Sequence, residues 1–184
     1  MDKLYFTEEH LMLRDMVRDF AVNEVRPISK EIDKKSIFPK ENIKKMAELG
    51  LMGIPWDTKY SGTGMDTRGL VIAIEEIGKE CASTAATMMA HTSLGTAPIA
   101  IFGNDEQKKK YLPLLASGKI LGAFGLTEPE AGSDAGNTQT RAIKHNDEYI
   151  INGQKVFCTN AGEAGTIIIT AVIEDNKVDK GIGA

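Results

Sequence analysis

The chain has 184 residues, of which 42% are hydrophobic and 26% are charged. A chain of this length can bury a sizeable core, and the composition is that of an ordinary globular protein, which excludes disordered and collagen-like chains. The charge is −4, from 22 basic and 26 acidic residues, and gives no general attraction to nucleic acid or to anionic membranes.

Targeting and metal signals are missing from the sequence. The two cysteines and three histidines show no metal-ligand spacing, so we expect no metal. The acidic N-terminus has no apolar core of a signal peptide, and no stretch approaches the roughly 18 apolar residues of a membrane span. We therefore expect a cytoplasmic protein with neither nucleic acid nor membrane as a partner.

The chain changes character near residue 118, where apolar residues at helical spacing give way to glycine-rich and β-branched segments. This pattern predicts an α+β protein with a helical domain at 1–118 and a β domain at 119–184. Pro27 is expected to end the first helix, and Gly50 to follow the end of the second. The expected helices begin after Thr7, at Pro39, at Asp66 or Thr67, at Ser83, near residue 96 and after Asn104.

The second part carries strand signals. Residues 120–126 form a short apolar run, residues 137–145 alternate loosely, and residues 166–173 are almost entirely β-branched. The Asn152-Gly153 pair between two apolar runs predicts a tight hairpin. We expect three or four antiparallel strands with an open edge.

Two segments in this part are candidates for chemistry. In the loop 126–136, the side chains of Thr127, Ser133 and Asp134 can hydrogen-bond, while Gly132 and Gly136 let backbone N–H groups approach a ligand. A rigid connection between strands explains this loop equally well.

The second candidate is the pair Phe157 and Thr159, which would share one face of a strand. Phe157 could cover a flat ring while Thr159 hydrogen-bonds its edge. A core aromatic residue beside a surface threonine is the favoured interpretation of this pair. The chain has neither a P-loop nor a Rossmann glycine pattern, so a nucleotide site of either kind is not expected.

The runs GAFGLTEPEAGSDAG at 122–136 and EYIINGQKVFCTNAG at 148–162 resemble the acyl-CoA dehydrogenase family. The same family is matched by the segments KMAELGLMGI at 45–54 and QKKKYLPLLASGKILGAF at 107–124. Within the family, the sequence most resembles the butyryl-CoA or short-chain branch. The resemblance implies a helical N-terminal domain, an antiparallel barrel-like middle domain and a C-terminal four-helix bundle, with FAD between the last two. That bundle has no counterpart in these 184 residues.

The resemblance also implies a set of FAD contacts. Leu126 and Thr127 would touch the pyrimidine edge of the flavin, and Phe157 would pack on the ring. Thr159 would hydrogen-bond near flavin N5, and Ser133 would contact both the pyrophosphate and the CoA side of the substrate. The residues implied in cofactor binding are Phe124, Leu126, Thr127, Gly132, Ser133, Phe157 and Thr159.

The implied reaction is α,β-dehydrogenation of an acyl-CoA, with electrons passing to an electron-transfer flavoprotein. The direction stays open, since some relatives reduce enoyl-CoA. The family's glutamate base lies in the bundle, so we expect no catalytic residue in this chain and no activity from it alone. Homodimers or homotetramers are implied for the full-length protein.

The alternatives are a non-catalytic interaction module and a fold-related flavin oxidase or monooxygenase. Glu128 and His91 are interpreted as structural residues.

Overall fold

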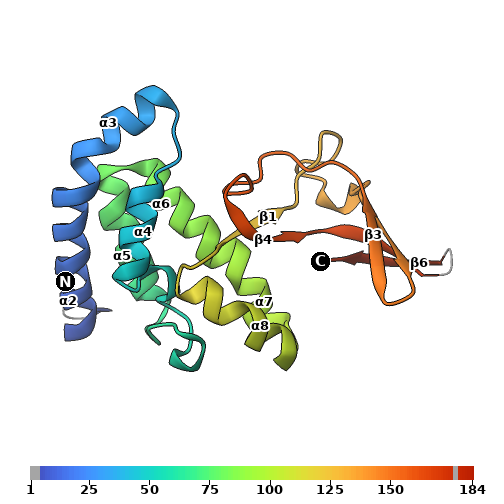
Figure 1. Ribbon diagram of the computed structural model, residues 1–184, viewed down its shortest axis with the longest axis horizontal. Coiled ribbons are helices and arrows are strands. Elements are labelled where there is room, and N and C mark those ends of the chain that lie inside the picture. The colour runs from blue at the N-terminus through green and yellow to red at the C-terminus, as the bar shows by residue number, and fades with distance from the viewer. Residues whose placement is uncertain (1–4, 176–177) are drawn as a thin grey trace.

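The computed structural model describes residues 5–175 and 178–184. Helices gather at one end of the molecule and strands at the other, and β1 leads from the helices into the strands (Figure 1). The last described α-helix ends at Ala116 and the first described strand begins at Leu121, so the passage from α-helices to strands spans the predicted domain boundary; one short 3-10 turn, η5 (Ala135–Asn137), lies among the strands.

Most of the first part is helical. Its α-helices are α2 (Glu8–Phe20), α3 (Arg26–Lys35), α4 (Lys40–Glu48), α5 (Thr67–Glu80), α6 (Ala82–Met89), α7 (Ala97–Phe102) and α8 (Asp105–Ala116). Two π-helical segments, η1 (Ala21–Val25) and η4 (Ala90–Thr96), and two 3-10 turns, η2 (Leu51–Gly53) and η3 (Thr58–Tyr60), join them.

The first helix is capped as predicted but does not end where predicted. The Thr7 side chain accepts a hydrogen bond from the backbone of His10, and the His10 ring accepts one from the backbone of Thr7. Pro27 does not stop the helix. The π segment opens the backbone ladder, because the Arg26 N–H bonds to Ala21 five residues back, and Pro27 then occupies the tolerated first turn of α3.

Other local signals are mostly confirmed. Gly50 follows α4 in the left-handed conformation, with φ of 74°. The Asp66 side chain caps α5, and Asn104 forms a capping box that opens α8. The predicted cap at Ser83 is wrong, because α6 starts at Ala82 with Cys81 at the N-cap and no side-chain cap bond.

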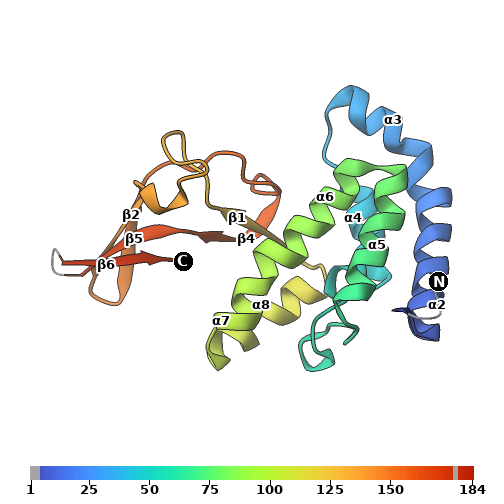
Figure 2. The same cartoon turned by 180° about the vertical axis from the view of Figure 1, so that it is seen from behind.

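The sequence also predicts that the helix beginning at Ser83 ends near Gly95, but the observed helix from residue 82 continues past that glycine. The π segment η4 joins α6 to α7, and the two follow one another as a single rod in both views (Figures 1 and 2). Gly95 is required by packing: a Cβ there would lie 2.5 Å from the Cα of Gly122 in β1. The rod therefore touches the first strand backbone to backbone.

The core of the helical part is made of apolar side chains from α2, α4, η2, α5 and α6. Met46, Leu51, Met52, Ile77 and Met88 are fully buried or nearly so. A second cluster of Ile99, Leu112 and Leu115 continues to Ile168 in β4, so apolar packing reaches the strands.

The strands are β1 (Leu121–Gly125), β2 (Arg141–His145), β3 (Glu148–Asn152), β4 (Ala164–Ile169), β5 (Ala171–Asp175) and β6 (Val178–Gly183). The α+β architecture is confirmed, but the expectation of antiparallel strands is wrong in part. β1 pairs with β4 and β2 with β5 in parallel, while β2–β3 and β5–β6 are antiparallel. Parallel partners require a long crossover, which the intervening residues supply.

Two strand predictions are corrected. The hairpin turns at Asn146, with φ of 57°, and pairs β2 with β3; residues 153–158 form no strand. Gly153 is needed instead for close approach, because a Cβ there would lie 2.6 Å from the Cβ of Thr140.

The run 166–173 is broken at Thr170, whose N–H bonds to Gly125. The chain passes there from the β1–β4 pair to the other sheet.

Candidate functional site

The end of β1 and the segment before Phe157 lie side by side. The Val156 N–H donates to the carbonyl oxygen of Thr127 at 2.8 Å, and the Lys155 ammonium donates to the carbonyl oxygen of Leu126 at 2.9 Å. These bonds bring Leu126 and Thr127 next to the residues that precede Phe157. Four of the predicted site residues, from two segments about 30 positions apart, therefore meet at one place. We call Leu126, Thr127, Phe157 and Thr159 the β1-end cluster.

Phe157 is not a core residue. Its side chain is 91% exposed, so the favoured interpretation of a core aromatic is wrong. Its φ of 56° lies in the left-handed region, which is uncommon for a bulky residue and costs free energy. Thr159 does not follow it along a strand either, because the Thr159 N–H bonds to the Phe157 carbonyl oxygen at 3.1 Å in a turn. The fold thus holds an aromatic ring outward in a conformation that needs support.

The remaining predicted site residues lie further along the loop. Glu128 and Ala131 exchange backbone hydrogen bonds around Pro129 and so form a tight turn. Gly132 and Ser133 follow this turn and are exposed, and no hydrogen bond among the described residues joins them to the β1-end cluster. Phe124 is half-buried in β1 opposite Ile168. The structure therefore brings four of the seven residues together.

Three of the predicted site residues carry hydroxyl groups without a hydrogen-bond partner in the part of the chain that the structure describes. Within residues 5–175 and 178–184, no side-chain hydrogen bond is made by Thr127, Ser133 or Thr159. Thr127 is half-buried, and the other two are exposed. The hydroxyls of Thr127 and Thr159 can donate and accept hydrogen bonds, and together with the outward Phe157 ring of the same cluster they form a surface suited to a flat polar ligand.

Glu128 holds the loop from beneath. Its carboxylate is buried and accepts from Lys155 Nζ at 2.7 Å, from both the N–H and the hydroxyl of Thr140, and from the Gln139 N–H. Burial raises the pKa of Glu128, but the Lys155 ion pair and these hydrogen bonds outweigh it and lower the pKa to about 2. The structural interpretation of Glu128 is confirmed.

Lys155 is the residue that sequence reasoning missed. Its ammonium also donates to the Thr170 hydroxyl at 3.1 Å, so one side chain links the loop after β1 to the break between β4 and β5. Its own side chain is only 8% exposed. The signal in the sequence was weak, because a lysine after Gly153 and Gln154 is typical of any solvated turn.

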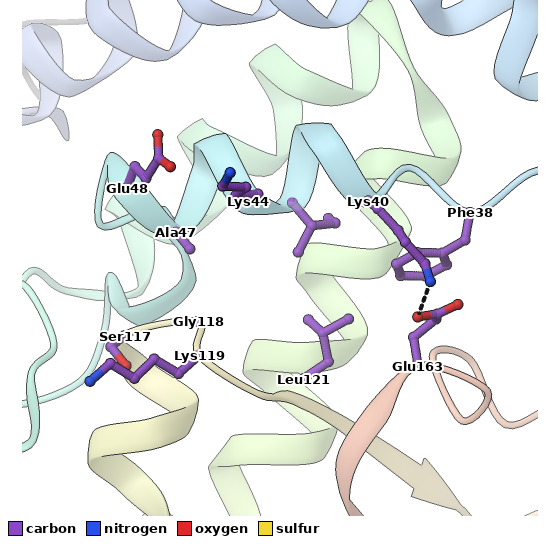
Figure 3. Close-up of a pocket in the computed structure, with 11 residues that line it drawn as sticks. Phe38, Lys40, Lys44, Ala47, Glu48, Ser117, Gly118, Lys119, Leu121 and Glu163 are labelled. Atoms are coloured by element: carbon purple, nitrogen blue, oxygen red, sulfur yellow. Dashed lines mark ion pairs between the residues drawn. The ribbon is translucent and has the colours of Figure 1, made fainter.

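A separate hollow of about 420 Å³ lies between α4 and the start of β1. Its floor is apolar, and Lys40 closes one side through a 2.8 Å ion pair with Glu163, as Figure 3 shows. None of the seven predicted site residues lines it. The hollow marks the junction between the helices and the turn after Thr159.

Metal-binding clusters and membrane-spanning helices are not found in the described chain. No group of three or more His, Cys, Asp or Glu side chains that could hold a metal ion occurs in the part of the chain that the structure describes. No described helix is long and apolar enough to cross a membrane.

The sequence matches two family models in the order that the structure suggests. Residues 7–119 match the acyl-CoA dehydrogenase N-terminal domain, and residues 123–184 match the acyl-CoA dehydrogenase middle domain. The chain belongs to the acyl-CoA dehydrogenase family.

Curated relatives agree with this assignment. The chain is 52% identical over 176 residues to the probable acyl-CoA dehydrogenase YngJ of Bacillus subtilis, covering 96% of this chain and 46% of that protein. It is 49% identical to the short-chain specific acyl-CoA dehydrogenase of Clostridium acetobutylicum, covering 97% and 47%. It is 46% identical to the acryloyl-CoA reductase (NADH) of Anaerotignum propionicum, covering 97% and 45%. The chain spans less than half the length of these relatives.

Solved structures share the fold. A structure described as the electron transferring flavoprotein of Acidaminococcus fermentans matches with a TM-score of 0.89 and 43% identity, over 92% of this chain and 44% of that one. The acyl-CoA dehydrogenase of Bacillus anthracis, complexed with FAD, matches with a TM-score of 0.86 and 39% identity, over 92% and 30%.

Proposed function

We propose that the β1-end cluster is one wall of an FAD site in an acyl-CoA dehydrogenase that acts on short-chain acyl-CoA thioesters. The observation that carries this proposal is the outward Phe157 ring, 91% exposed at a φ of 56°, in one cluster with the hydroxyls of Thr127 and Thr159, which bond to no described residue. An exposed ring held in a strained backbone conformation is typical of a surface that a ligand or a partner covers.

The residues present fit a flavin. Phe157 would lie on the ring, while the hydroxyls of Thr127 and Thr159 would hydrogen-bond its polar edges. Leu126 would pack on the pyrimidine side, with Phe124 behind it in the strand. Gly132 and Ser133 would meet the pyrophosphate, and Ser133 also the CoA side, because both are exposed and a Cβ at Gly132 would meet no atom within 4 Å. FAD, when bound, supplies the acceptor for the β hydrogen of the substrate.

We propose dehydrogenation to the trans-2-enoyl-CoA as the reaction, with an electron-transfer flavoprotein as the acceptor. The Clostridium acetobutylicum relative, named as short-chain specific, supports the substrate class. The similarity to the Acidaminococcus fermentans structure, described as an electron transferring flavoprotein, supports the acceptor. The Anaerotignum propionicum relative is named as a reductase, so the test must include both directions.

Two acids near the β1-end cluster in the sequence, Glu128 and Glu163, are not free to act as the base. Glu128 is held ionised under the loop by Lys155, and Glu163 pairs with Lys40 at the junction. A base needs a free lone pair within reach of the substrate α proton. We therefore propose that the base, like the bundle that the resemblance implies, is not supplied by these 184 residues, and that they are inactive alone.

We also propose a cytoplasmic location and an oligomeric state for the protein. Cys81 and Cys158 are free thiols, which suits a reducing compartment such as the cytoplasm. The family resemblance leads us to propose a homodimer or homotetramer for the full-length protein.

The test uses the protein expressed from its complete reading frame. We expect it to purify yellow, with a visible flavin band that bleaches anaerobically on addition of butyryl-CoA. A dye-coupled assay with butyryl-CoA, and the reverse assay with crotonyl-CoA and reduced dye, measure the two directions. Colourless protein that reduces no dye would support an interaction module instead. Flavin that is bleached by a nitroalkane but not by any acyl-CoA would support a fold-related oxidase.

A further inference from the structure

Gly122 in β1 is held through both of its backbone polar groups. Its N–H donates to Nδ1 of His91 at 2.9 Å, and its carbonyl oxygen accepts from the Asn160 side-chain amide at 3.3 Å. No side chain stands between the strand and the η4 segment here, because Gly95 meets Gly122 directly. The start of β1 is thus fixed by two side chains from distant parts of the chain.

His91 links β1 to the end of α8. It is fully buried, and its Nε2 lies 3.1 Å from the carbonyl oxygen of Leu115. A carbonyl oxygen only accepts and the Gly122 N–H only donates, so Nε2 carries the proton and Nδ1 accepts. Burial lowers the pKa of His91 to about 4, which keeps the ring neutral at physiological pH. Both nitrogens are occupied, as the structural interpretation of this residue requires.

Asn160 links β1 to the turn that carries Phe157 and Thr159. Its amide nitrogen donates to the carbonyl oxygens of Thr87 and Gly122, which fixes the orientation of the amide. The residue is buried and adopts a φ of 71°, so the turn has left-handed residues at both Phe157 and Asn160. Asparagine is among the few residues that tolerate this conformation.

Both contacts converge on one residue at the base of the β1-end cluster. Gly122 lies five residues before Thr127 in a strand, and Asn160 directly follows Thr159. The distance between β1 and the turn therefore depends on Gly122 being held from both sides. A shift of either segment would separate Thr127 from Phe157 and Thr159. Even a small displacement of binding residues lowers the affinity for a ligand that must contact all of them.

We infer that His91 and Asn160 are positioning residues: through Gly122 they set the spacing of β1 and the Phe157 turn, and so the fit of the flavin ring. This inference rests on the proposed function. It assigns neither residue a contact with the cofactor or the substrate.

The test compares two variants of the complete protein that each keep one hydrogen bond of His91. His91→Asn places an amide oxygen where Nδ1 stood and can still accept from Gly122. His91→Gln places its amide where Nε2 stood and can still donate to Leu115. Both variants lose one buried hydrogen bond, so a merely structural histidine would give both the same outcome.

We expect His91→Asn to keep the wild-type visible circular dichroism of the flavin and an FAD dissociation constant within about twofold of wild type. His91→Gln should alter the spectrum and weaken FAD binding to the deflavinated protein about tenfold, which corresponds to about 1.4 kcal/mol. Asn160→Ala should behave like His91→Gln, and it decides the question if His91→Gln does not fold. Glu163→Gln, a change three residues after Asn160 that leaves Gly122 untouched, is the matched control.

The inference is overturned if His91→Gln, or Asn160→Ala in its place, is folded and keeps the wild-type spectrum and FAD affinity. It is also overturned if His91→Asn and His91→Gln change the two flavin measurements equally. Absence of FAD from the wild-type protein would instead refute the proposed function. The two failures are therefore distinguishable.

Discussion

Replacing Lys155 with methionine should destabilise the strand region strongly. The substitution keeps the aliphatic length of the side chain and removes the ammonium that binds Glu128, Leu126 and Thr170. The two charged side chains are 8% and 3% exposed, so water cannot replace the lost partner without a rearrangement. Breaking a buried ion pair from one side leaves an uncompensated charge and costs about 3–5 kcal/mol.

The lower end of that range applies here. The Glu128 carboxylate keeps three other donors, namely the N–H and hydroxyl of Thr140 and the N–H of Gln139. We expect a loss of about 3 kcal/mol at neutral pH, or a fall of about 6–12 °C in the thermal midpoint. Lys109→Met, which removes an exposed lysine on α8, is the control and should stay within about 0.5 kcal/mol.

The loss should depend on pH. The pKa of Glu128 is lowered from 4.5 to about 2 in the folded protein. Its ionised carboxylate therefore adds stability above pH 4.5, and this contribution is lost as the pH falls toward 2. Without Lys155, the pKa of Glu128 should be higher than in the wild type, because burial still raises it and the ion pair no longer lowers it. As the pH falls, the variant should therefore protonate Glu128 at a higher pH than the wild type does, and protonation removes the uncompensated buried charge. Urea unfolding followed by circular dichroism should show a smaller difference from wild type at pH 4 than at pH 7. An equal difference at both, or less than about 1 kcal/mol at pH 7, would refute the reasoning.

Two further predictions concern the fold. Thr7→Ala removes the cap of α2 and should cost about 1 kcal/mol, measured as a fall of about 2–4 °C in the thermal midpoint; no change would show that the cap is dispensable. Gly153→Ala should cost about 1–3 kcal/mol, because the new Cβ would lie 2.6 Å from the Cβ of Thr140. Gly162→Ala, where a Cβ meets nothing within 4 Å, is its control; equal effects would contradict the packing argument.

Local rules predicted local features. The caps at Thr7, Asp66 and Asn104 and the left-handed Gly50 each depend on a few neighbouring residues, so the sequence carries the whole interaction. Pro27 does not end the helix, because the π-helical segment before it already lacks the regular i to i−4 hydrogen bonds. The spacing of apolar residues in the sequence does not predict such a segment.

Pairing over long distances could not be predicted in the same way. Asn146 and the Asn152-Gly153 pair are both plausible turn formers, and the close approach of Gly153 to Thr140 is a contact that the local pattern does not reveal. The parallel partners of β1 and β2 lie across long crossovers, which hydrophobic patterns do not specify.

The candidate site shows the same division. The loop residues Leu126 and Thr127 and the turn residues Phe157 and Thr159 were named from motifs, and the structure places them together. Lys155 was missed because its partners lie far from it in the sequence, at Leu126 and Glu128 in the loop and at Thr170 between β4 and β5. The outward position of Phe157 was also missed, since the strand pattern around it predicted burial.

The central claim is that the β1-end cluster binds flavin, and FAD titration of the deflavinated complete protein tests it most directly. The comparison is between Phe157→Ala and Phe102→Ala, which removes an aromatic side chain, 83% exposed, at the end of α7. We predict that Phe157→Ala weakens FAD binding about tenfold, because the ring no longer stacks on the flavin. The thermal midpoint should not change, because the substitution removes no core contact. Phe102→Ala should bind FAD as wild type does. Equal FAD affinity for wild type and Phe157→Ala would contradict the account.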